Sequence, residues 1–352
     1  MSKGRNRTVA SVMLVWPLVV APSGAVASAA NADGRQPPDK PSQQREPRGD
    51  GQLESVVITE EAETLVVTGT SDAEIFDIRA SADATVLTIQ HSRMSDGVPG
   101  PWDLTGAPGC GAVNAGTVSC DVASVSLVSL ELLAGVGSWQ GNHVNLFPPL
   151  PDPAPIVQVV GGPDRDSLNA WKYSGRTRFF GRGGKDEMDG SAQRDFASGG
   201  SGRDHLYGYG GNDHLLGGDG SDLVRGDRAW NIGPELPGDD RLSGGRGNDS
   251  LHGENGADLV EGDGGNDRVV GDEDADRVFG GPGEDWLHGK AGGDLLVGDK
   301  GDDVVYGGRG PDESWSSDGY ADDVNCGLGI DSAIFDWRDL IYRCERADKS
   351  RR

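Results

Sequence analysis

A nine-residue frame repeats fourteen times between Gly181 and Trp315, and it constrains the fold of this chain more than any other feature. The frame reads Gly, any, any, Gly, any, Asp, any, apolar, any, as in "GGSGRDHLY" from Gly199 to Tyr207. One apolar residue in nine cannot form a helix face, but it can be the inward side chain of a three-residue strand. The other six residues then form a turn, in which glycines supply positive φ. The frame therefore predicts an all-β chain that completes half a coil every nine residues.

Two frames close one coil, so residues eighteen apart stack along an axis at the usual strand spacing of about 4.8 Å. We therefore expect a parallel β-roll (β-solenoid) with the apolar residue of position eight pointing inward. The position-eight residues are Met188, Ala197, Leu206, Leu215, Val224, Leu242, Leu251, Val260, Val269, Val278, Leu287, Leu296 and Val305. Ser314 breaks this pattern, and we expect the array to end there.

Three irregularities interrupt the frame. Gln193 and Asp274 replace the glycine of position four, so the frame does not predict the conformation of the neighbouring turns. A loop, "RAWNIGPEL", is inserted before Asp240 and should bulge outward without breaking the stack. An isolated earlier copy, "GGPDRDSLN" from Gly161, places Asp166 at position six, so the array begins near Gly161 with one irregular unit.

Position six is aspartate in every frame. The two-frame coil places alternate aspartates on opposite edges of the roll. The first edge carries Asp186, Asp204, Asp222, Asp249, Asp267, Asp285 and Asp303. The second edge carries Asp195, Asp213, Asp240, Asp258, Asp276, Asp294 and Asp312. Each edge is thus a ladder of carboxylates.

Such a ladder opposes its own folding. Neighbouring carboxylates at the strand spacing repel by roughly 3 kcal/mol per pair at an effective dielectric near 20. One buried Leu or Val per frame contributes about 1.5 to 3 kcal/mol, whereas ordering nine residues costs about 1.5 kcal/mol each. A hard divalent cation between coils would neutralise the ladder and bind turn carbonyls as well. Ca²⁺ suits this better than Mg²⁺ because it accepts six to eight oxygens flexibly, and the six gaps per edge predict about a dozen Ca²⁺ ions.

The repeats resemble the RTX, or haemolysin-type, calcium-binding repeat family. The frames "GGSGRDHLY", "GGDGSDLVR", "GGRGNDSLH" and "GGPGEDWLH" carry the resemblance, which covers Gly161 to Trp315. It implies a parallel β-roll in which position-six carboxylates, here also Asp166, and turn carbonyls bind calcium between coils. The tail, residues 316–352, resembles the end unit of secreted actinobacterial proteins of this type and is predicted to be a C-terminal cap.

The N-terminal segments predict export. Lys3, Arg5 and Arg7 precede an apolar run and small residues with an Ala-x-Ala pattern, which is typical of a secretory signal peptide over residues 1–29. The run is too short for a membrane-spanning helix, and no later segment resembles one. Residues 30–52, with almost no apolar side chains, should be a disordered linker. These features predict an extracellular protein.

Residues 53–160 contain β-type runs such as "TLVVTG" and "ATVLTIQ" and should form a β-rich domain. We expect it to be a β-solenoid or sandwich-like extension of the roll, because "GTSDAEIFDI" and "GNHVNL" are eroded copies of the Gly-x-Asp-x-apolar motif. The four cysteines of an exported chain favour disulfides. Of the three possible connectivities we prefer Cys110–Cys120 and Cys326–Cys344, because each pair lies in one segment and the second would staple the cap.

The net charge and the motifs of the chain limit the classes of function that we expect. A formal charge of −25 argues against nucleic acid as a partner and favours cations. The chain has no HExxH and no GxSxG motif, so we predict no enzyme but a secreted calcium-binding protein whose roll folds on binding calcium. Two alternatives stay open. One is a calcium-dependent adhesin or cell-surface protein that contacts a glycan or partner through Trp230, Trp286 or Trp315; the other is an RTX-type secreted enzyme with an unrecognised active site in residues 53–160.

Overall fold

The computed structural model describes residues 56–61, 64–68, 74–80, 86–93, 102–103, 109–121, 127–131, 142–147, 154–227 and 237–350. Within these residues the chain forms strands β1–β30 and no helix, which confirms the all-β prediction. No helix among them is therefore long and apolar enough to cross a membrane. The predicted signal peptide, the predicted linker and the inserted loop around Trp230 lie outside the described residues.

The strands form two sheets of fifteen strands each, named here sheet A and sheet B. Sheet A contains, in spatial order, β5 (Trp102–Asp103), β1 (Val56–Glu61), β2 (Thr64–Thr68), β8 (Leu127–Glu131), β10 (Ile156–Val160), β12 (Thr177–Gly184), β14 (Phe196–Gly202), β16 (His214–Gly220), β18 (Arg241–Arg246), β20 (Leu259–Gly264), β22 (Arg277–Pro282), β24 (Leu295–Lys300), β26 (Glu313–Trp315), β28 (Ser332–Phe335) and β30 (Arg346–Lys349). Sheet B contains, in spatial order, β6 (Cys110–Asn114), β7 (Thr117–Asp121), β4 (Val86–Arg93), β3 (Glu74–Ala80), β9 (His143–Phe147), β11 (Ser167–Asn169), β13 (Glu187–Asp189), β15 (His205–Tyr209), β17 (Leu223–Asp227), β19 (Ser250–Asn255), β21 (Arg268–Glu273), β23 (Trp286–Ala291), β25 (Val304–Arg309), β27 (Asp323–Leu328) and β29 (Leu340–Tyr342).

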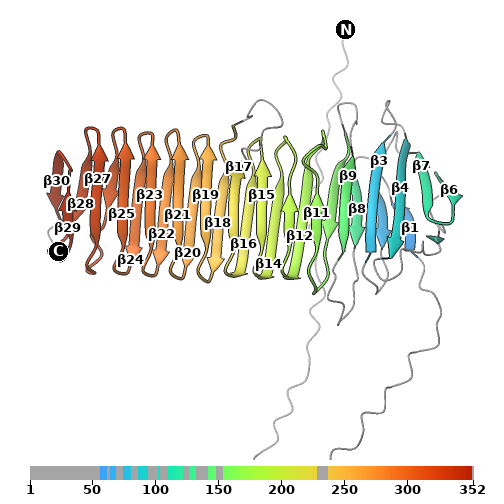
Figure 1. Ribbon diagram of the computed structural model, residues 1–352, viewed down its shortest axis with the longest axis horizontal. Coiled ribbons are helices and arrows are strands. Elements are labelled where there is room, and N and C mark those ends of the chain that lie inside the picture. The colour runs from blue at the N-terminus through green and yellow to red at the C-terminus, as the bar shows by residue number, and fades with distance from the viewer. Residues whose placement is uncertain are drawn as a thin grey trace, which may run out of the picture. The chain divides into compact units, whose positions relative to one another are not determined.

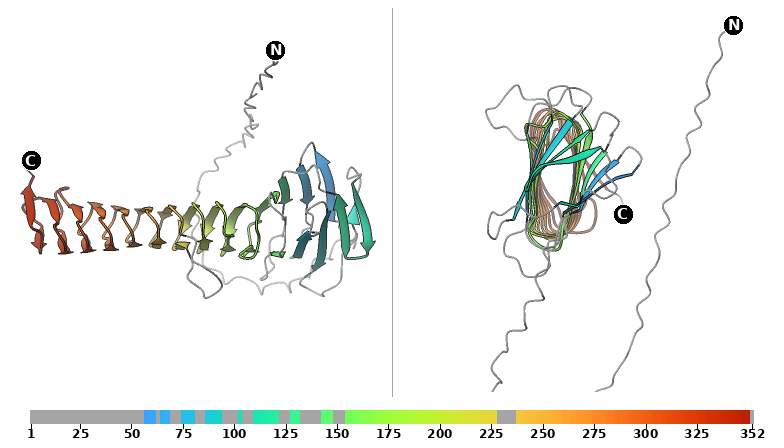
Figure 2. Two further views of the ribbon diagram at one scale, coloured as in Figure 1. Left: turned by 90° about the horizontal axis from the view of Figure 1, so that it is seen from above. Right: turned by 90° about the vertical axis from the view of Figure 1, so that its right-hand side faces the viewer.

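From β8 onward, consecutive strands alternate between the two sheets, and each strand pairs in parallel with the next strand of its own sheet (Figure 1). The register joins residues eighteen apart, as in Leu206 with Val224 and Val260 with Val278. Seen along the stack, the coils superpose into a flattened ring (Figure 2, right). These features confirm the parallel β-roll predicted from the nine-residue frame.

The core lies between the sheets and includes all the predicted position-eight side chains, of which each is at most 1% exposed. Ser314 is also buried, in β26, and its strand pairs with β24 on one side and β28 on the other. The structure thus differs from the expected end of the array at Ser314, because the stack continues with Val324 and Ala333 in the core. Backbone pairing holds a coil in place even where one inward side chain is small and polar.

The strands of the regular coils are longer than the three residues expected, with six residues in each of β18–β25. They extend through positions one to three because the turn backbones of neighbouring coils pair as well, for example Gly200 with Gly218. Positive φ occurs at positions two and four, and position two often adopts it without glycine, as at Glu254 (77°) and Lys290 (75°). The glycines of position one do not adopt positive φ, so they serve another purpose.

The strands that precede the repeats extend the roll. β8 pairs in parallel with β10, and β9 pairs in parallel with β11, so both sheets continue into this region. Further out, β3, β4, β7 and β6 pair with antiparallel neighbours. The described strands of residues 53–160 therefore form an extension of the roll, as expected from its eroded motifs.

Both disulfides have the predicted local connectivity. Cys110–Cys120 joins β6 to β7, and Cys326–Cys344 joins β27 to the residues that follow β29. The second bond links two successive coils near the C-terminal end of the stack.

The C326A/C344S double variant should loosen only the last coils. Removing a disulfide that spans eighteen residues increases the conformational entropy of the unfolded segment. The free energy of unfolding of this segment should therefore fall by about 3 kcal/mol. Amide hydrogen exchange should become roughly 100-fold faster in residues 340–349 and stay unchanged in residues 205–300. The control is C110S/C120S, which should affect residues 110–121 alone. Uniformly faster exchange along the roll in C326A/C344S would contradict this local role.

Candidate metal centre

Position six lies directly before each strand of the regular coils, and its aspartate side chain is turned inward, where it is at most 4% exposed. The backbone N–H of each ladder aspartate donates to Oδ1 of the aspartate one coil further on, over 2.7 to 3.0 Å. Asp166 enters the first edge in the same way, by donating to Asp186 Oδ1. The hydrogen bonds thus arrange the aspartates in the two ladders that the sequence predicts.

The second carboxylate oxygen of most ladder aspartates is buried and has no hydrogen-bond partner. These oxygens are Oδ2 of Asp186, Asp204, Asp213, Asp222, Asp240, Asp249, Asp258, Asp267, Asp276, Asp285, Asp294, Asp303 and Asp312. Asp166 and Asp195 differ, because their Oδ2 atoms accept hydrogen bonds from the N–H groups of Gly162 and Ser191. A buried carboxylate oxygen without a partner is costly, so each of the thirteen is a candidate ligand atom for a cation.

The glycine of position one leaves space beside this oxygen. A Cβ on Gly244 would lie 2.6 Å from Asp249 Oδ2 and 2.6 Å from the carbonyl oxygen of Gly262 in the next coil. A Cβ on Gly217 would likewise lie 2.7 Å from Asp222 Oδ2 and 2.5 Å from the Gly244 carbonyl oxygen. A carboxylate and a carbonyl oxygen therefore converge on a space that any side chain would fill. This donor set fits Ca²⁺, which binds carboxylates together with backbone carbonyls.

Burial is the main reason why the ladder resists ionisation. It raises the pKa of Asp213 to about 10, and the carboxylates of Asp195 and Asp240 add to the effect. The pKa of Asp186, Asp258, Asp276 and Asp303 rises to about 8 for the same leading cause. At neutral pH the ladder must therefore bind either protons or cations. The sequence emphasised repulsion between neighbours, whereas the structure makes desolvation the larger contribution.

The ladders continue beyond the last predicted residue. Asp322 Oδ1 accepts the N–H of Asp303, Asp331 Oδ1 accepts that of Asp312, and both Oδ2 atoms are buried without partners. Sequence reasoning missed both residues because a one-residue insertion makes these steps nineteen residues long. The signal that was available is an aspartate two residues before an inward side chain, here Val324.

At their other end the ladders begin with uncharged residues. Asn142 donates its backbone N–H to Asp166 Oδ1, and Thr177 does the same to Asp195 Oδ1. Both residues occupy the place of a ladder aspartate, and the eroded motif "GNHVNL" marks the position of Asn142. Without a carboxylate these two coils offer no strong cation ligand, and the unpartnered oxygens begin at Asp186 and Asp213, one coil after Asp166 and Asp195.

The frame irregularities do not interrupt the ladders. Asp274 takes the place of a position-four glycine by adopting a φ of 72°. Across the inserted loop, Asp213 donates to Asp240 Oδ1 over 2.7 Å although 27 residues separate them. The coils on both sides of the insertion therefore stack directly, as predicted.

A separate cluster lies on the outer face of sheet B. His252, Glu254 and Asp272 bring one ligand atom each within 4.8 Å of one another. Lys290 pairs with Asp272, and Arg225 pairs with Glu254. The pKa of Asp272 is below its usual value. Burial acts to raise this pKa, but the hydrogen bonds from His252 and Lys290 lower it by more. This network is thus neutralised within the protein, unlike the ladders.

Comparison with known families identifies the repeats. The model of the RTX calcium-binding nonapeptide repeat matches four times, at residues 189–224, 236–269, 261–296 and 279–313. No curated protein matches the chain. The matched residues include every ladder aspartate from Asp195 to Asp312. Residues 189–313 of the chain therefore carry RTX-type calcium-binding nonapeptide repeats, which are wound into a β-solenoid.

Proposed function

We propose that this chain is a secreted protein without catalytic activity, and that its β-roll folds when calcium binds between successive coils. One observation carries the proposal: two ladders of buried aspartates hold unpartnered Oδ2 atoms beside the carbonyl oxygens of the next coil. Bound Ca²⁺ would supply the positive charge that these oxygens lack. The ladder aspartates would bind the ion, and the position-one glycines would keep its space open.

Calcium binding would be coupled to folding because the candidate ligand oxygens come from different coils. Asp249 Oδ2 and the Gly262 carbonyl belong to different coils, which come together only in the stacked roll. The free energy of calcium binding then adds to the free energy of folding. In a cell interior with little free calcium the chain would stay unfolded, and it would fold after export. The two disulfides support this location, because disulfides persist in oxidising compartments.

A role as an interaction protein is a second candidate, favoured by the C-terminal coils. Among the described residues, the exposed large apolar side chains are concentrated in this region. They are Trp315, Tyr320, Leu328, Ile330, Trp337, Leu340 and Tyr342, with Val113 as the exception elsewhere. Such a cluster is typical of a surface that contacts a partner. The calcium-folded roll would then present this surface.

Calcium titration calorimetry with a matched pair of variants tests the proposal. The full chain should bind several Ca²⁺ ions, about a dozen if every gap between ladder carboxylates is filled, and should not bind Mg²⁺ comparably. Asp213→Asn keeps an oxygen for the Asp195 N–H but removes the charge, so it should cost at least one ion. Asp219→Asn, an exposed acid in the same coil, should cost none. Equal stoichiometry in both variants would refute the role of the ladder.

A further inference from the structure

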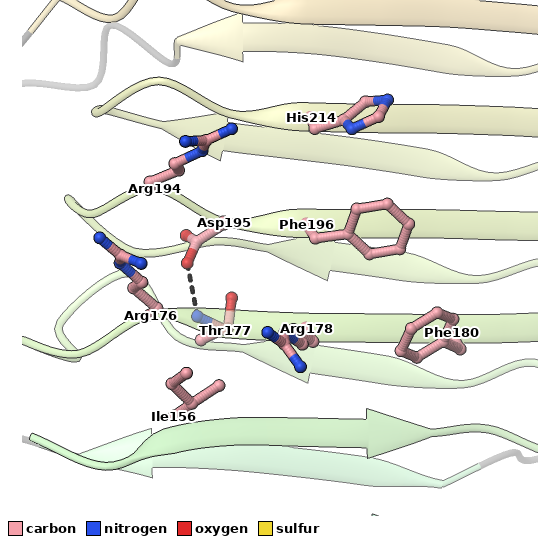
Figure 3. A pocket seen from close by; sticks show the side chains of 9 residues that line it. All are labelled: Ile156, Arg176, Thr177, Arg178, Phe180, Arg194, Asp195, Phe196 and His214. Carbon is pink, nitrogen blue, oxygen red and sulfur yellow. Dashed lines mark hydrogen bonds between the residues drawn. The ribbon is translucent and has the colours of Figure 1, made fainter. Parts of the chain in front are cut away.

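Three arginines gather on the outer face of sheet A, where the roll begins (Figure 3). Arg178 points outward from β12 between the buried side chains of Thr177 and Phe179. Arg176 and Arg194 lie one coil apart in matching positions, each directly before a residue of the second ladder. All three side chains are exposed and line one pocket with Ile156, Phe180, Phe196 and His214.

These guanidinium groups have no acid to pair with in the described part of the chain. Arg165, Arg225 and Arg246 each form an ion pair with a nearby carboxylate, whereas Arg176, Arg178 and Arg194 form none with any described residue. The only carboxylate of the pocket lining, Asp195, is buried and accepts the N–H groups of Thr177 and Ser191. Like charges in adjacent coils repel unless an anion lies between them. In a chain of charge −25, these three exposed arginines form a local positive patch.

Aromatic rings line the same pocket as the arginines. The rings of Phe180 and Phe196 are 5.3 Å apart, and His214 meets Phe196 edge to face at 5.4 Å. These side chains are partly exposed and extend across β12, β14 and β16 (Figure 3).

We propose that this pocket binds a uronic acid residue of an acidic polysaccharide. Arg176 and Arg194, which lie one coil apart on the same pocket, would hold the carboxylate with their N–H groups, and the sugar ring would lie against Phe180 and Phe196. Arg178 would donate to sugar hydroxyls. A nucleic acid is disfavoured, because three arginines on two coils form no basic stripe along which a phosphate backbone could bind. The inference rests on the proposed function, since β12 and β14 come together only in the folded roll.

Calorimetry on the calcium-saturated full chain tests the site. The probes are an oligogalacturonate and a neutral glucose oligomer of equal length, and only the first should bind. The double variant R176Q/R194Q should weaken oligogalacturonate binding at least about tenfold, and F196A should weaken it by a similar factor. The control is R277Q, which removes an exposed arginine from the same face of sheet A but outside the pocket and should bind as the wild type does.

Calcium stoichiometry and circular dichroism are measured for each variant, so that a folding defect is distinguished from a lost contact. R178Q provides a second, milder variant, with an expected loss of roughly threefold, should the double variant fold poorly. Equal binding of both oligomers, or unchanged affinity in correctly folded R176Q/R194Q and R178Q, would overturn the site. Equally tight binding of single-stranded DNA or inorganic phosphate would overturn the sugar assignment. Oligogalacturonate binding that persists in chelator would instead contradict calcium-dependent folding and leave this site standing.

Discussion

In excess chelator at about pH 8 the far-ultraviolet circular dichroism signal of the β-roll should be lost, and acidification to about pH 4 should restore it without calcium. Burial raises the pKa of the ladder aspartates in the folded chain, to about 10 for Asp213 and about 8 for Asp186, from a usual value of 3.8. The folded state therefore holds protons that the unfolded state releases. The free energy of unfolding of the metal-free roll is greatest below about pH 4 and falls as the pH rises through these values.

Calcium should remove this dependence, because it neutralises the ladder at a pH where protons no longer do. The experiment is a pH series from about 4 to 8 in chelator, in calcium and in magnesium, with circular dichroism and limited proteolysis as readouts. The sequence isoelectric point of about 4.5 makes aggregation at the acid end a concern, so sedimentation velocity is the control. A full β signal in chelator at pH 8 would show that the ladder tolerates its charge and would contradict folding on calcium.

A second large effect is expected from Gly202→Ala, a change of one methyl group. Gly202 occupies position four with a φ of 142°, and a Cβ there would overlap the carbonyl oxygen of Gly184 and lie 2.6 Å from its carbon. The two coils would have to separate to admit the methyl group. We expect the free energy of unfolding to fall by about 3 kcal/mol or more, which corresponds to a fall in Tm of roughly 10 °C for the calcium-loaded protein.

Gly264→Ala is the matched control for this change. Gly264 occupies position three, its φ is not in the left-handed region, and the nearest atom to an added Cβ would be 3.8 Å away. Its Tm should stay within about 2 °C of the wild type. Thermal unfolding of both variants in calcium provides the measurement. Similar values for the two variants would mean that close stacking of the turns does not limit the stability of the roll.

The sequence by itself determined the roll, its core and its two ladders. A nine-residue period is a local property, because half a coil is formed by residues adjacent in the chain. Leu206 therefore had to face inward, Asp204 had to lie directly before a strand, and Asp222 had to stack on it. Local spacing also led to the correct pairing of Cys326 with Cys344.

Only the tertiary structure decided which atoms of the ladder remain free. One oxygen of Asp249 is used by the backbone of Asp222 in the preceding coil, and the other remains beside the carbonyl of Gly262 in the following coil. That division depends on contacts between coils, which no single frame contains. The glycine of position one is needed for the same reason: it admits an oxygen from its own aspartate and another from the next coil.

The ends of the array and the arginine pocket also required the tertiary structure. A one-residue insertion hides Asp322 from a nine-residue pattern, but the stacked backbone absorbs it and keeps the aspartate in the ladder. Arg176, Phe196 and His214 come from three successive coils and from outward positions, where the frame allows any residue. Their proximity is a property of the stack, because residues eighteen or twenty apart in the sequence become neighbours only when the coils are wound.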